Sequence, residues 1–245
     1  MDHCGEEKKE RIQTVKIGII GAMDVEVARL TAGMNKEREI ERAGMHFCEG
    51  WIGGSEVVVV RCGIGKVNAG LCVQILCDLF DVTHVINTGI AGSLDEEINI
   101  GDVVVSIDAM YHDMDVTGLG YEPGQVPQLK VLAFPADNML RVAAVKACRE
   151  AAPEIGVFEG RVVSGDQFIC ERSRKDEIAA TFGGLCTEME GAAIAQAAYI
   201  NGIPFVIVRA ISDKADESVH VSYEEFEAKA AEHCASIVEH MVKSL

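Results

Sequence analysis

The stretch from Leu185 to Ala215 constrains the fold of this chain most, because it joins a helix of small residues to a buried strand. Glu190 opens a run of alanines, and Asn201-Gly202 is the kind of signal at which a helix ends. Pro204 to Val208 is a continuous apolar run, the pattern of a strand that is buried on both faces. A helix of small residues can pack closely against a sheet, so the stretch predicts an α/β protein.

Polar residues stand at both ends of this helix-and-strand unit. Arg209, Ser212 and Asp213 follow the strand, and Glu188 and Glu190 precede the helix. Open α/β sheets usually bind their ligands at the carboxyl ends of the strands, so these residues are candidates for a functional site. They are also compatible with a structural ion pair of Arg209 with Glu188 or Asp213.

Three other predicted strands also end in polar or glycine-rich residues. The strands cover Val15–Gly21, Thr83–Thr88 and 157–163. The segments that follow them are a helix start with Glu26, a Gly89–Gly92 turn, and Phe168-Ile169. An acid in a first helical turn also complements the helix dipole, so position alone does not assign Glu26 a function. The strand that begins at Pro204, with Arg209 and Asp213 after it and Glu188–Glu190 nearby, supplies the fourth strand end. The four strand ends are predicted to converge on one site.

The other predicted elements complete a single α/β domain over residues 15–245. They are a helix capped by Asp24 with Val27, Leu30 and Met34 on one face, a hairpin of Met45–Trp51 and Glu56–Arg61, and a helix from Lys66 to about Phe80. They are followed by a strand over Asp102–Ser106 and helices over 137–151 and 172–181. The last helix has a capping box of Ser222 and Glu225 and a buried stripe of Phe226, Ala230, Ile237 and Met241. The Gly- and Pro-rich segment Gly118–Pro135 is predicted to be a lid, a wall or an interface.

Charge and cysteine usage exclude several classes of partner. Among 245 residues, Lys+Arg 22 against Asp+Glu 39 gives a net charge of −17, which disfavours nucleic acid and anionic membrane surfaces as partners. The nine cysteines form no C-x-x-C pair, so we expect no zinc site and a reduced, cytoplasmic environment. Residues 1–14, with their charged EEKKER run, are predicted to be a poorly ordered tail.

The predicted site holds more acids than bases, and this favours a cationic transition state over a bound phosphate. The Tyr111–Asp115 segment, with one histidine and two aspartates, could ligate a metal, but a hydrogen-bonded loop explains it better. We therefore expect neither a metal nor a cofactor.

Seven motifs resemble the signatures of one enzyme family. They are GIIGAMDVEV, CGIGKVNAG, INTGIAGSL, YHDMDVT, SGDQFI, EMEGAAIA and VRAISDKAD. In this order, from about Val15 to the C-terminus, they are similar to the 5′-methylthioadenosine/S-adenosylhomocysteine nucleosidases of the nucleoside phosphorylase superfamily. The resemblance implies a three-layer, phosphorylase/hydrolase-like fold with a central mixed β-sheet flanked by helices, and usually a homodimer. It also implies hydrolysis of the N-glycosidic bond, which gives adenine and a thioribose.

The resemblance also implies roles for the charged residues. Asp213 would donate a proton to N7 of adenine, and Glu26 would position and deprotonate the attacking water. Arg209 and Glu188 would hold the same water, and Glu190 would accept hydrogen bonds from the ribose hydroxyls. An aspartate is normally ionised at pH 7, so this role predicts that burial or a neighbour favours neutral Asp213.

The same resemblance assigns the walls of the substrate pocket. Phe168 and Ile169 would stack on the purine, Ser212 would steady Asp213, Met189 would line the ribose, and Met23, Ala91 and Gly92 would line the sugar and water side. Val116, Tyr223 and Ile64 would form the alkylthio pocket, and Ile64, Leu119 and Pro127 would reach the site of a neighbouring subunit. From pattern alone, the apolar members of this set would be read as core residues.

Two departures from the family pattern bear on activity. Ile90 stands where the family often has a serine near the water, and Tyr223 replaces a common phenylalanine at the mouth of the alkylthio pocket. Three alternatives stay open: a phosphate-dependent phosphorylase of the same superfamily, an aminodeoxyfutalosine nucleosidase, and a non-catalytic nucleoside-binding protein. A binding protein would not require both an acid and a base, and a phosphate site would require cationic donors.

Overall fold

The computed structural model of the chain describes residues 15–216 and 219–245, of which 219–225 are described in their backbone only. The predicted tail, residues 1–14, lies outside the described residues. Within the described ranges, none of the helices combines the length and the apolar character that a membrane crossing requires.

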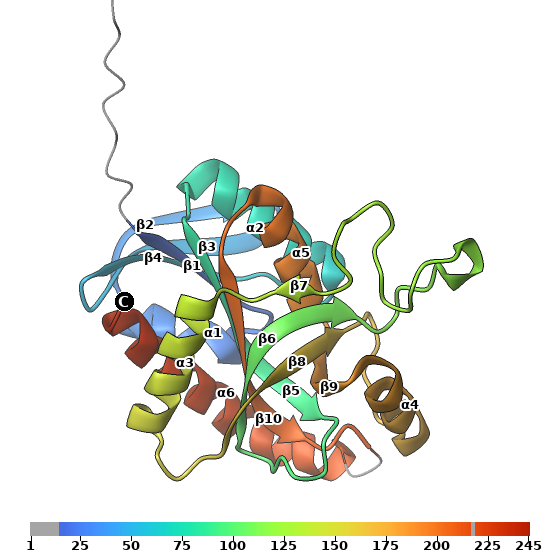
Figure 1. Cartoon of the computed structure of the whole chain (residues 1–245). Coiled ribbons are helices and arrows are strands. Elements are labelled where there is room, and N and C mark those ends of the chain that lie inside the picture. Colours follow the sequence, from blue (N-terminus) through green and yellow to red (C-terminus); the bar gives the residue numbers. More distant parts are fainter. Residues whose placement is uncertain (1–14, 217–218) are drawn as a thin grey trace, which may run out of the picture.

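A mixed β-sheet forms the centre of the described molecule (Figure 1). Its strands are β1 (Lys16–Gly21), β2 (Asn35–Arg42), β3 (Met45–Ile52), β4 (Ser55–Arg61), β5 (His84–Ser93), β6 (Val103–Tyr111), β7 (Phe134–Pro135), β8 (Val157–Ser164), β9 (Gly184–Glu188) and β10 (Phe205–Asp213). Their order is β10-β6-β8-β9-β5-β1-β4-β3-β2, with β7 beside β6. Because β5 also pairs with β10, five strands close into a ring, and β1 to β4 extend from it.

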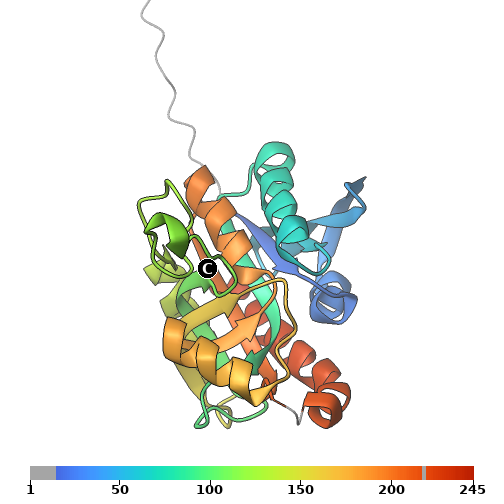
Figure 2. The same cartoon turned by 90° about the vertical axis from the view of Figure 1, so that its right-hand side faces the viewer.

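Helices cover both faces of this sheet, as predicted. They are α1 (Asp24–Gly33), α2 (Lys66–Phe80), α3 (Asn138–Ala151), α4 (Arg172–Phe182), α5 (Gly191–Asn201) and α6 (Val219–Lys243), with a 3₁₀ turn η1 (Thr117–Leu119). Buried residues of α1, α3 and α6 share one cluster with the strands, and those of α2 and α5 share another. Figure 2 shows α2 and α5 side by side.

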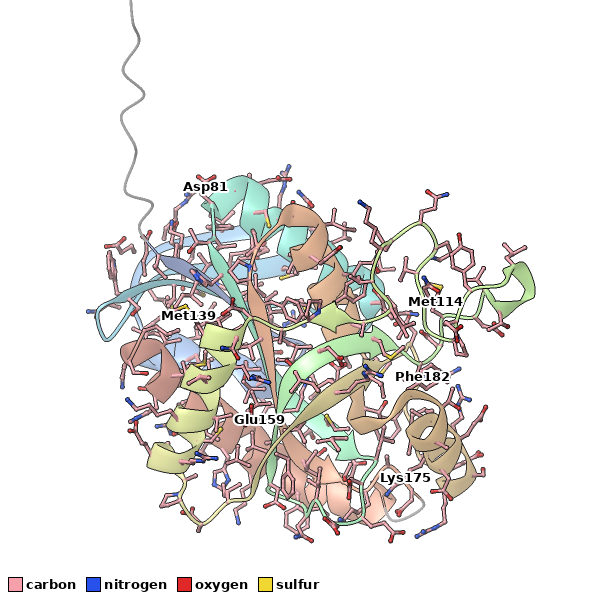
Figure 3. All side chains as sticks on the ribbon, in the orientation of Figure 1. Asp81, Met114, Met139, Glu159, Lys175 and Phe182 are labelled. Atoms are coloured by element: carbon pink, nitrogen blue, oxygen red, sulfur yellow. The ribbon has the colours of Figure 1, made fainter. Side chains whose placement is uncertain are left out.

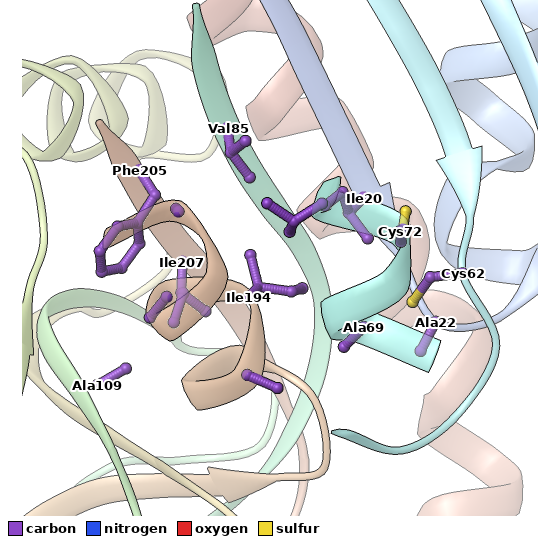
Figure 4. Packing of buried hydrophobic residues seen from close by; sticks show 14 of the residues in the cluster. Ile20, Ala22, Cys62, Ala69, Cys72, Val85, Ala109, Ile194, Phe205 and Ile207 are labelled. Carbon is purple, nitrogen blue, oxygen red and sulfur yellow. The ribbon is translucent and has the colours of Figure 1, made fainter. Parts of the chain in front are cut away.

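The helix α5 packs closely because its inward residues are small. Ala192, Ala195 and Ala198 are fully buried, and Ile194 lies with Ile20 and Val85 in one cluster (Figure 4). Gly202 ends the helix in the left-handed conformation that favours glycine, as the sequence predicts. The C-terminal end of α5 therefore turns directly into β10.

Several predicted boundaries were wrong, and three strands were not predicted: β2, β9 and the short β7, which pairs with β6 at the end of the Gly118–Pro135 segment. The strands β5 and β10 run on through Gly89–Gly92 and Arg209–Asp213, where the sequence predicts loops, because the parallel ladder between them continues to that point. The charged strand β2 pairs with β3, and β9 pairs with β8. Both are stabilised by strand pairing, which local hydrophobic periodicity does not reveal.

Two predicted helix caps were also wrong. Helix α1 is capped at Met23, and Asp24 is its first helical residue. Helix α6 begins at Val219, so Ser222 lies inside it and is not its N-cap, and the side chains of Ser222 and Glu225 lie outside the described residues. The buried stripe is confirmed for Ala230, Ile237 and Met241, all of which are fully or almost fully buried.

Candidate active site

One cavity lies at the ends of the predicted strands β1, β5, β8 and β10 and of β9, and it brings together most of the predicted site residues. With its open mouth it encloses about 640 Å³ of space that no protein atom fills. Its wall consists of Ala22, Met23, Glu26, Ile64, Ile90, Ala91, Gly92, Gln167, Phe168, Ile169, Thr187, Glu188, Met189, Glu190, Ser212 and Asp213. The predicted convergence of the four strand ends is therefore confirmed.

Arg209 lies behind this wall and holds three carboxylates together. Its side chain is fully buried, and its Nη2 pairs closely with Glu188. Glu190 Oε2 is 3.8 Å from Nη2, and Glu26 Oε1 is 4.0 Å from Nη1. Burial works against the charge of Arg209, but the carboxylates outweigh it and hold the pKa of Arg209 above its ordinary range. The guanidinium therefore stays charged and orients the acids.

Glu26 is fixed by backbone donors at the start of α1. Its Oε2 accepts hydrogen bonds from the N–H groups of Ala22 (2.6 Å) and Met23 (3.0 Å), and its Oε1 accepts one from Ile90 (3.0 Å). Burial nevertheless raises the pKa of Glu26, and the nearby Arg209 opposes this shift. Ile90 thus contributes its backbone N–H, although its side chain offers no hydroxyl.

Glu190 forms the second acidic wall and comes from the N-cap of α5. It is buried, and its Oε1 accepts a hydrogen bond from the Gly65 N–H at 2.8 Å. Burial and then the neighbouring Glu188 raise the pKa of Glu190 to about 8. A carboxyl group with such a pKa can exchange its proton near neutral pH.

Glu188 is held more firmly than the sequence predicts. Besides Arg209, it accepts hydrogen bonds from the Gly191 N–H (2.8 Å) and from the Ser164 hydroxyl. Ser164 and Asn87, which accepts from Arg209 Nη2 at 2.7 Å, were not predicted as site residues. The sequence signal that could have identified them was a polar residue in or directly after an apolar strand: Asn87 lies in β5, and Ser164 ends β8.

Asp213 lies in the same cavity but is separate from the cluster around Arg209. The Ser212 hydroxyl donates to its Oδ2 and the Ala215 N–H donates to its Oδ1, both at 2.8 Å. Burial raises the pKa of Asp213, as predicted, and these two hydrogen bonds oppose the shift. Gly92 faces this carboxylate, because an added Cβ would lie 2.8 Å from Asp213 Oδ1.

The predicted apolar walls divide into two groups. Met23, Ile64, Phe168, Ile169 and Met189 line the cavity, and Phe168 is 54% exposed. Val116, Leu119 and Pro127 do not line the cavity of their own chain. They lie on the segment between β6 and β7, residues 112–133, which carries η1 and projects from the sheet (Figure 1). This segment is called the excursion below. The side chain of Tyr223 lies outside the described residues.

The segment considered as a metal site is only partly occupied by protein contacts. Asp113 Oδ2 pairs with Lys66, but among the described residues the two ring nitrogens of buried His112 and Asp113 Oδ1 have no hydrogen-bond partner. Among the described residues, Glu39, His46 and Cys48 come within ligand distance of one another on β2 and β3, but Lys36 already pairs with Glu39 at 2.6 Å. The charged groups in the cavity wall are all carboxylates.

Comparison with known proteins agrees with this geometry. Residues 16–243 match the profile of the phosphorylase superfamily. The 5′-methylthioadenosine/S-adenosylhomocysteine nucleosidase of an Exiguobacterium species is 43% identical over 94% of this chain and 99% of its own. The homologue from Shewanella halifaxensis is 41% identical over 94% of this chain and its own full length.

Solved structures give the same result. The nucleosidase of Neisseria meningitidis in complex with methylthio-immucillin-A superposes with a TM-score of 0.90 at 39% identity, over 94% of this chain and 99% of that one. A futalosine hydrolase of Helicobacter pylori superposes with a TM-score of 0.88 at 33% identity, over 95% and 99% of the two chains. The predicted fold is thus confirmed, and the chain belongs to the 5′-methylthioadenosine/S-adenosylhomocysteine nucleosidase family of the phosphorylase superfamily.

Proposed function

We propose that this protein hydrolyses the N-glycosidic bond of 5′-methylthioadenosine and S-adenosylhomocysteine, giving adenine and the corresponding thioribose. The observation that carries the proposal is the division of the buried acids within one cavity. Asp213 stands apart with a raised pKa, and Glu26, Glu188 and Glu190 surround Arg209. Breaking a ribosyl–purine bond requires a proton for the leaving base and negative charge beside the cationic sugar, and these two groups supply them.

Asp213 is proposed as the general acid. In its protonated form it donates a proton to N7 of adenine, so that the base leaves without a full negative charge. The hydrogen bonds from Ser212 and Ala215 fix the direction of the carboxyl group. Phe168 and Ile169 are proposed to stack on the purine beside it.

Glu26 is proposed as the base that takes a proton from the attacking water. Three backbone donors fix its carboxylate. Arg209 is fully buried and does not line the cavity, so we propose that it acts on the water chiefly by positioning Glu26. Glu188 does line the cavity, and we propose that it helps to hold the water there. Glu190 accepts hydrogen bonds from the ribose hydroxyls and, once ionised, stabilises the oxocarbenium-like transition state.

Water is favoured over phosphate as the nucleophile. Among the described residues that line the cavity there is no lysine and no arginine, and the ionisable groups are Glu26, Glu188, Glu190 and Asp213. A phosphate dianion would be repelled by these acids, because charges interact strongly where water is excluded.

Aminodeoxyfutalosine is a second candidate substrate. The H. pylori protein that is 33% identical to this chain is described as a futalosine hydrolase. The proposed acid and base would act on the same ribosyl–purine bond in either substrate. The 5′ substituent alone would distinguish them.

We also propose that the protein is a homodimer in which each excursion reaches the neighbouring site. Leu119 is 78% exposed on η1, and it lies outside its own cavity, as do Val116 and Pro127. On the body of the molecule, Val67, Leu71 and Ile200 are exposed over α2 and α5. A second copy that covers this apolar face would bring the excursion residues to the cavity next to Ile64.

The test is purine release from methylthioadenosine, S-adenosylhomocysteine and aminodeoxyfutalosine in phosphate-free buffer, repeated with phosphate. We expect adenine from the first two without phosphate, and the relative rates identify the preferred 5′ substituent. Release that requires phosphate would contradict the assignment of Glu26 to water.

A further inference from the structure

We infer that Lys66, Asp113 and Asp166 form a positioning clamp that holds two walls of the active-site cavity, those of Ile64 and Phe168, in register. None of the three lines the cavity, and the proposed chemistry uses none of them. The inference rests on the proposed function, since it concerns how the same site binds its nucleoside.

The clamp is a compact network of charges. Lys66 Nζ lies 2.6 Å from Asp113 Oδ2 and 3.7 Å from Asp166 Oδ2. Two backbone groups join it: the Lys66 N–H donates to Asp166 Oδ1 at 2.9 Å, and the Asp166 N–H donates to Asp113 Oδ2 at 2.9 Å. Each member thus contacts the other two.

The three members belong to segments that are far apart in the sequence. Lys66 begins α2 directly after Ile64, Asp113 follows β6, and Asp166 follows β8. Asp166 stands two residues before Phe168, and Asp113 three residues before Val116. The pairing of β6 with β8, continued by the hydrogen bond from the His112 N–H to the Ser164 carbonyl at 2.9 Å, already places Asp113 beside Asp166. The contacts of Lys66 join the start of α2 to this pair of strand ends.

The turn before α2 connects the clamp to the proposed ribose site. The Gly65 N–H donates to Glu190 Oε1, and the next N–H along the chain, that of Lys66, donates to Asp166. A shift of this turn would therefore move the Glu190 contact, Ile64 and the Phe168 segment together. The clamp couples the purine wall to the ribose wall.

The surroundings of the ammonium strengthen these contacts. The side chains of Lys66 and Asp113 are only 23% and 13% exposed. Lys66 Nζ also lies 5.3 Å from the ring centroid of Tyr111, whose hydroxyl donates to Gln196. Partly desolvated ion pairs are screened less by solvent and salt than exposed ones.

A positioning role and a purely structural role predict different kinetics. The clamp supports the Ile64 and Phe168 walls, which contact the substrate in the ground state and in the transition state alike, and it reaches Glu190 only through the backbone N–H of Gly65. Loss of the clamp therefore weakens the binding of the substrate and of the transition state equally, which raises KM and leaves kcat nearly unchanged. A purely structural ion pair would lower thermal stability and leave both constants of the folded enzyme unchanged.

The experiment compares Lys66→Met with Lys16→Met. Lys16 is a matched control, because it also pairs with two carboxylates, Glu49 and Glu56, each at 2.7 Å, and it lies at the opposite end of β1 from the cavity. Because Lys66 also lines the groove between α2 and α5, sedimentation velocity first compares the oligomeric state of each variant with that of wild type. At unchanged oligomeric state, we expect Lys66→Met to raise KM for methylthioadenosine by about tenfold or more with kcat within about threefold, and Lys16→Met to leave KM unchanged. A rise in KM that occurs only with dissociation would overturn the clamp. Lys66→Arg, which keeps the charge, should restore most of the affinity.

A double-mutant cycle tests whether the residues act as a unit. Lys66→Met combined with Asp113→Asn should raise KM no further than the stronger single variant, and Asp166→Asn should reproduce the effect. Equal KM for Lys66→Met and Lys16→Met, additive effects in the cycle, or a loss confined to kcat would each overturn the clamp. Absence of turnover in the wild-type enzyme would instead refute the proposed function.

Discussion

At the scale of single residues, the environment of each acid decides its role. Glu188 accepts from Arg209, Ser164 and the start of α5, so its charge is compensated by protein donors. Glu190 has fewer such donors, and its pKa is raised to about 8. Asp213 has no arginine partner among the described ion pairs, and burial raises its pKa. Carboxyl groups in one cavity thus have different hydrogen-bond and charge partners, and burial raises the pKa of both Glu190 and Asp213.

Replacement of Asp213 by Asn tests the assignment of the general acid. The amide keeps the size of the side chain but cannot protonate N7, so we expect kcat to fall by about 10²- to 10⁴-fold while nucleoside binding is largely kept. An Asp-to-Asn variant of the H. pylori nucleosidase has been crystallised with 5′-methylthioadenosine in its active site. Asp78→Asn on the surface of α2 is the control, and purine release near the wild-type rate from Asp213→Asn would refute the role.

The raised pKa of Glu190 predicts how stability depends on pH. Between the ordinary value of 4.5 and the folded value of about 8, the folded protein binds a proton that the unfolded chain has lost. This contribution to stability is complete below about pH 4.5 and is lost as the pH rises through about 8. Glu190→Gln, which has no such proton, should therefore gain in stability relative to wild type across this window and level off above it.

Thermal unfolding of the substrate-free protein between pH 5 and 9 measures this difference. Glu154→Gln, at an exposed position, is the control and should follow the wild-type curve. A constant difference between Glu190→Gln and wild type over the whole range would show that Glu190 titrates normally in the folded protein.

At the scale of elements, the site is built from strands that run further than their apolar runs. The ladder of β5 and β10 continues through Gly89 and Arg209, which are paired in register. The absence of a side chain at Gly89 leaves room for the Arg209 guanidinium and the Glu26 carboxylate, because an added Cβ would overlap both. The pairing of β5 with β10 thus brings the Arg209 guanidinium close to the Glu26 carboxylate.

Gly89→Ala should for this reason disable the enzyme and destabilise it. We expect a loss of about 1–3 kcal/mol in the free energy of unfolding from overpacking, and at least about a 10²-fold loss of kcat/KM from displacement of Glu26. Gly54→Ala is the control, since nothing lies within 4 Å of a Cβ added there. Denaturant unfolding and steady-state kinetics test both effects, and wild-type activity in Gly89→Ala would contradict the packing argument.

At the scale of the whole molecule, the excursion leaves the body of its own chain. Figure 3 labels Met114 on this segment and Met139 on α3, well apart from each other. The groove between α2 and α5 is lined by Val67, Tyr111, Met114, Ala197 and Ile200, among others. We propose this groove as part of the dimer interface.

A charge placed on this face should therefore dissociate the dimer. Val67→Glu, at a position that is 73% exposed in the single chain, would bury an unpaired carboxylate in the interface, and we expect monomers together with a raised KM. Met139→Glu, at a position that is 79% exposed on α3, should stay dimeric. Sedimentation velocity measures both, and a monomeric wild-type protein or a fully dimeric Val67→Glu would refute the interface.

The sequence by itself determined the class of fold and most of the residues around the cavity. Apolar runs identified the buried strands β1, β5, β8 and β10. Polar residues after β1 and at the end of β10 identified Glu26 and Asp213, and the start of the alanine helix identified Glu190. This succeeded because the carboxyl ends of parallel strands meet at one edge, so local patterns point to a common place. The family motifs contained the same residues in the same order.

The tertiary structure decided what local patterns do not contain. Three contacts join segments that are distant in the sequence: the closure of β5 onto β10, the pairing of β9 with β8, and the clamp of Lys66 with Asp113 and Asp166. The protonation of Glu190 and Asp213 likewise depends on burial and on neighbours brought from other elements. Sequence pattern reports local propensity, whereas desolvation and charge pairing act between groups that only folding brings together.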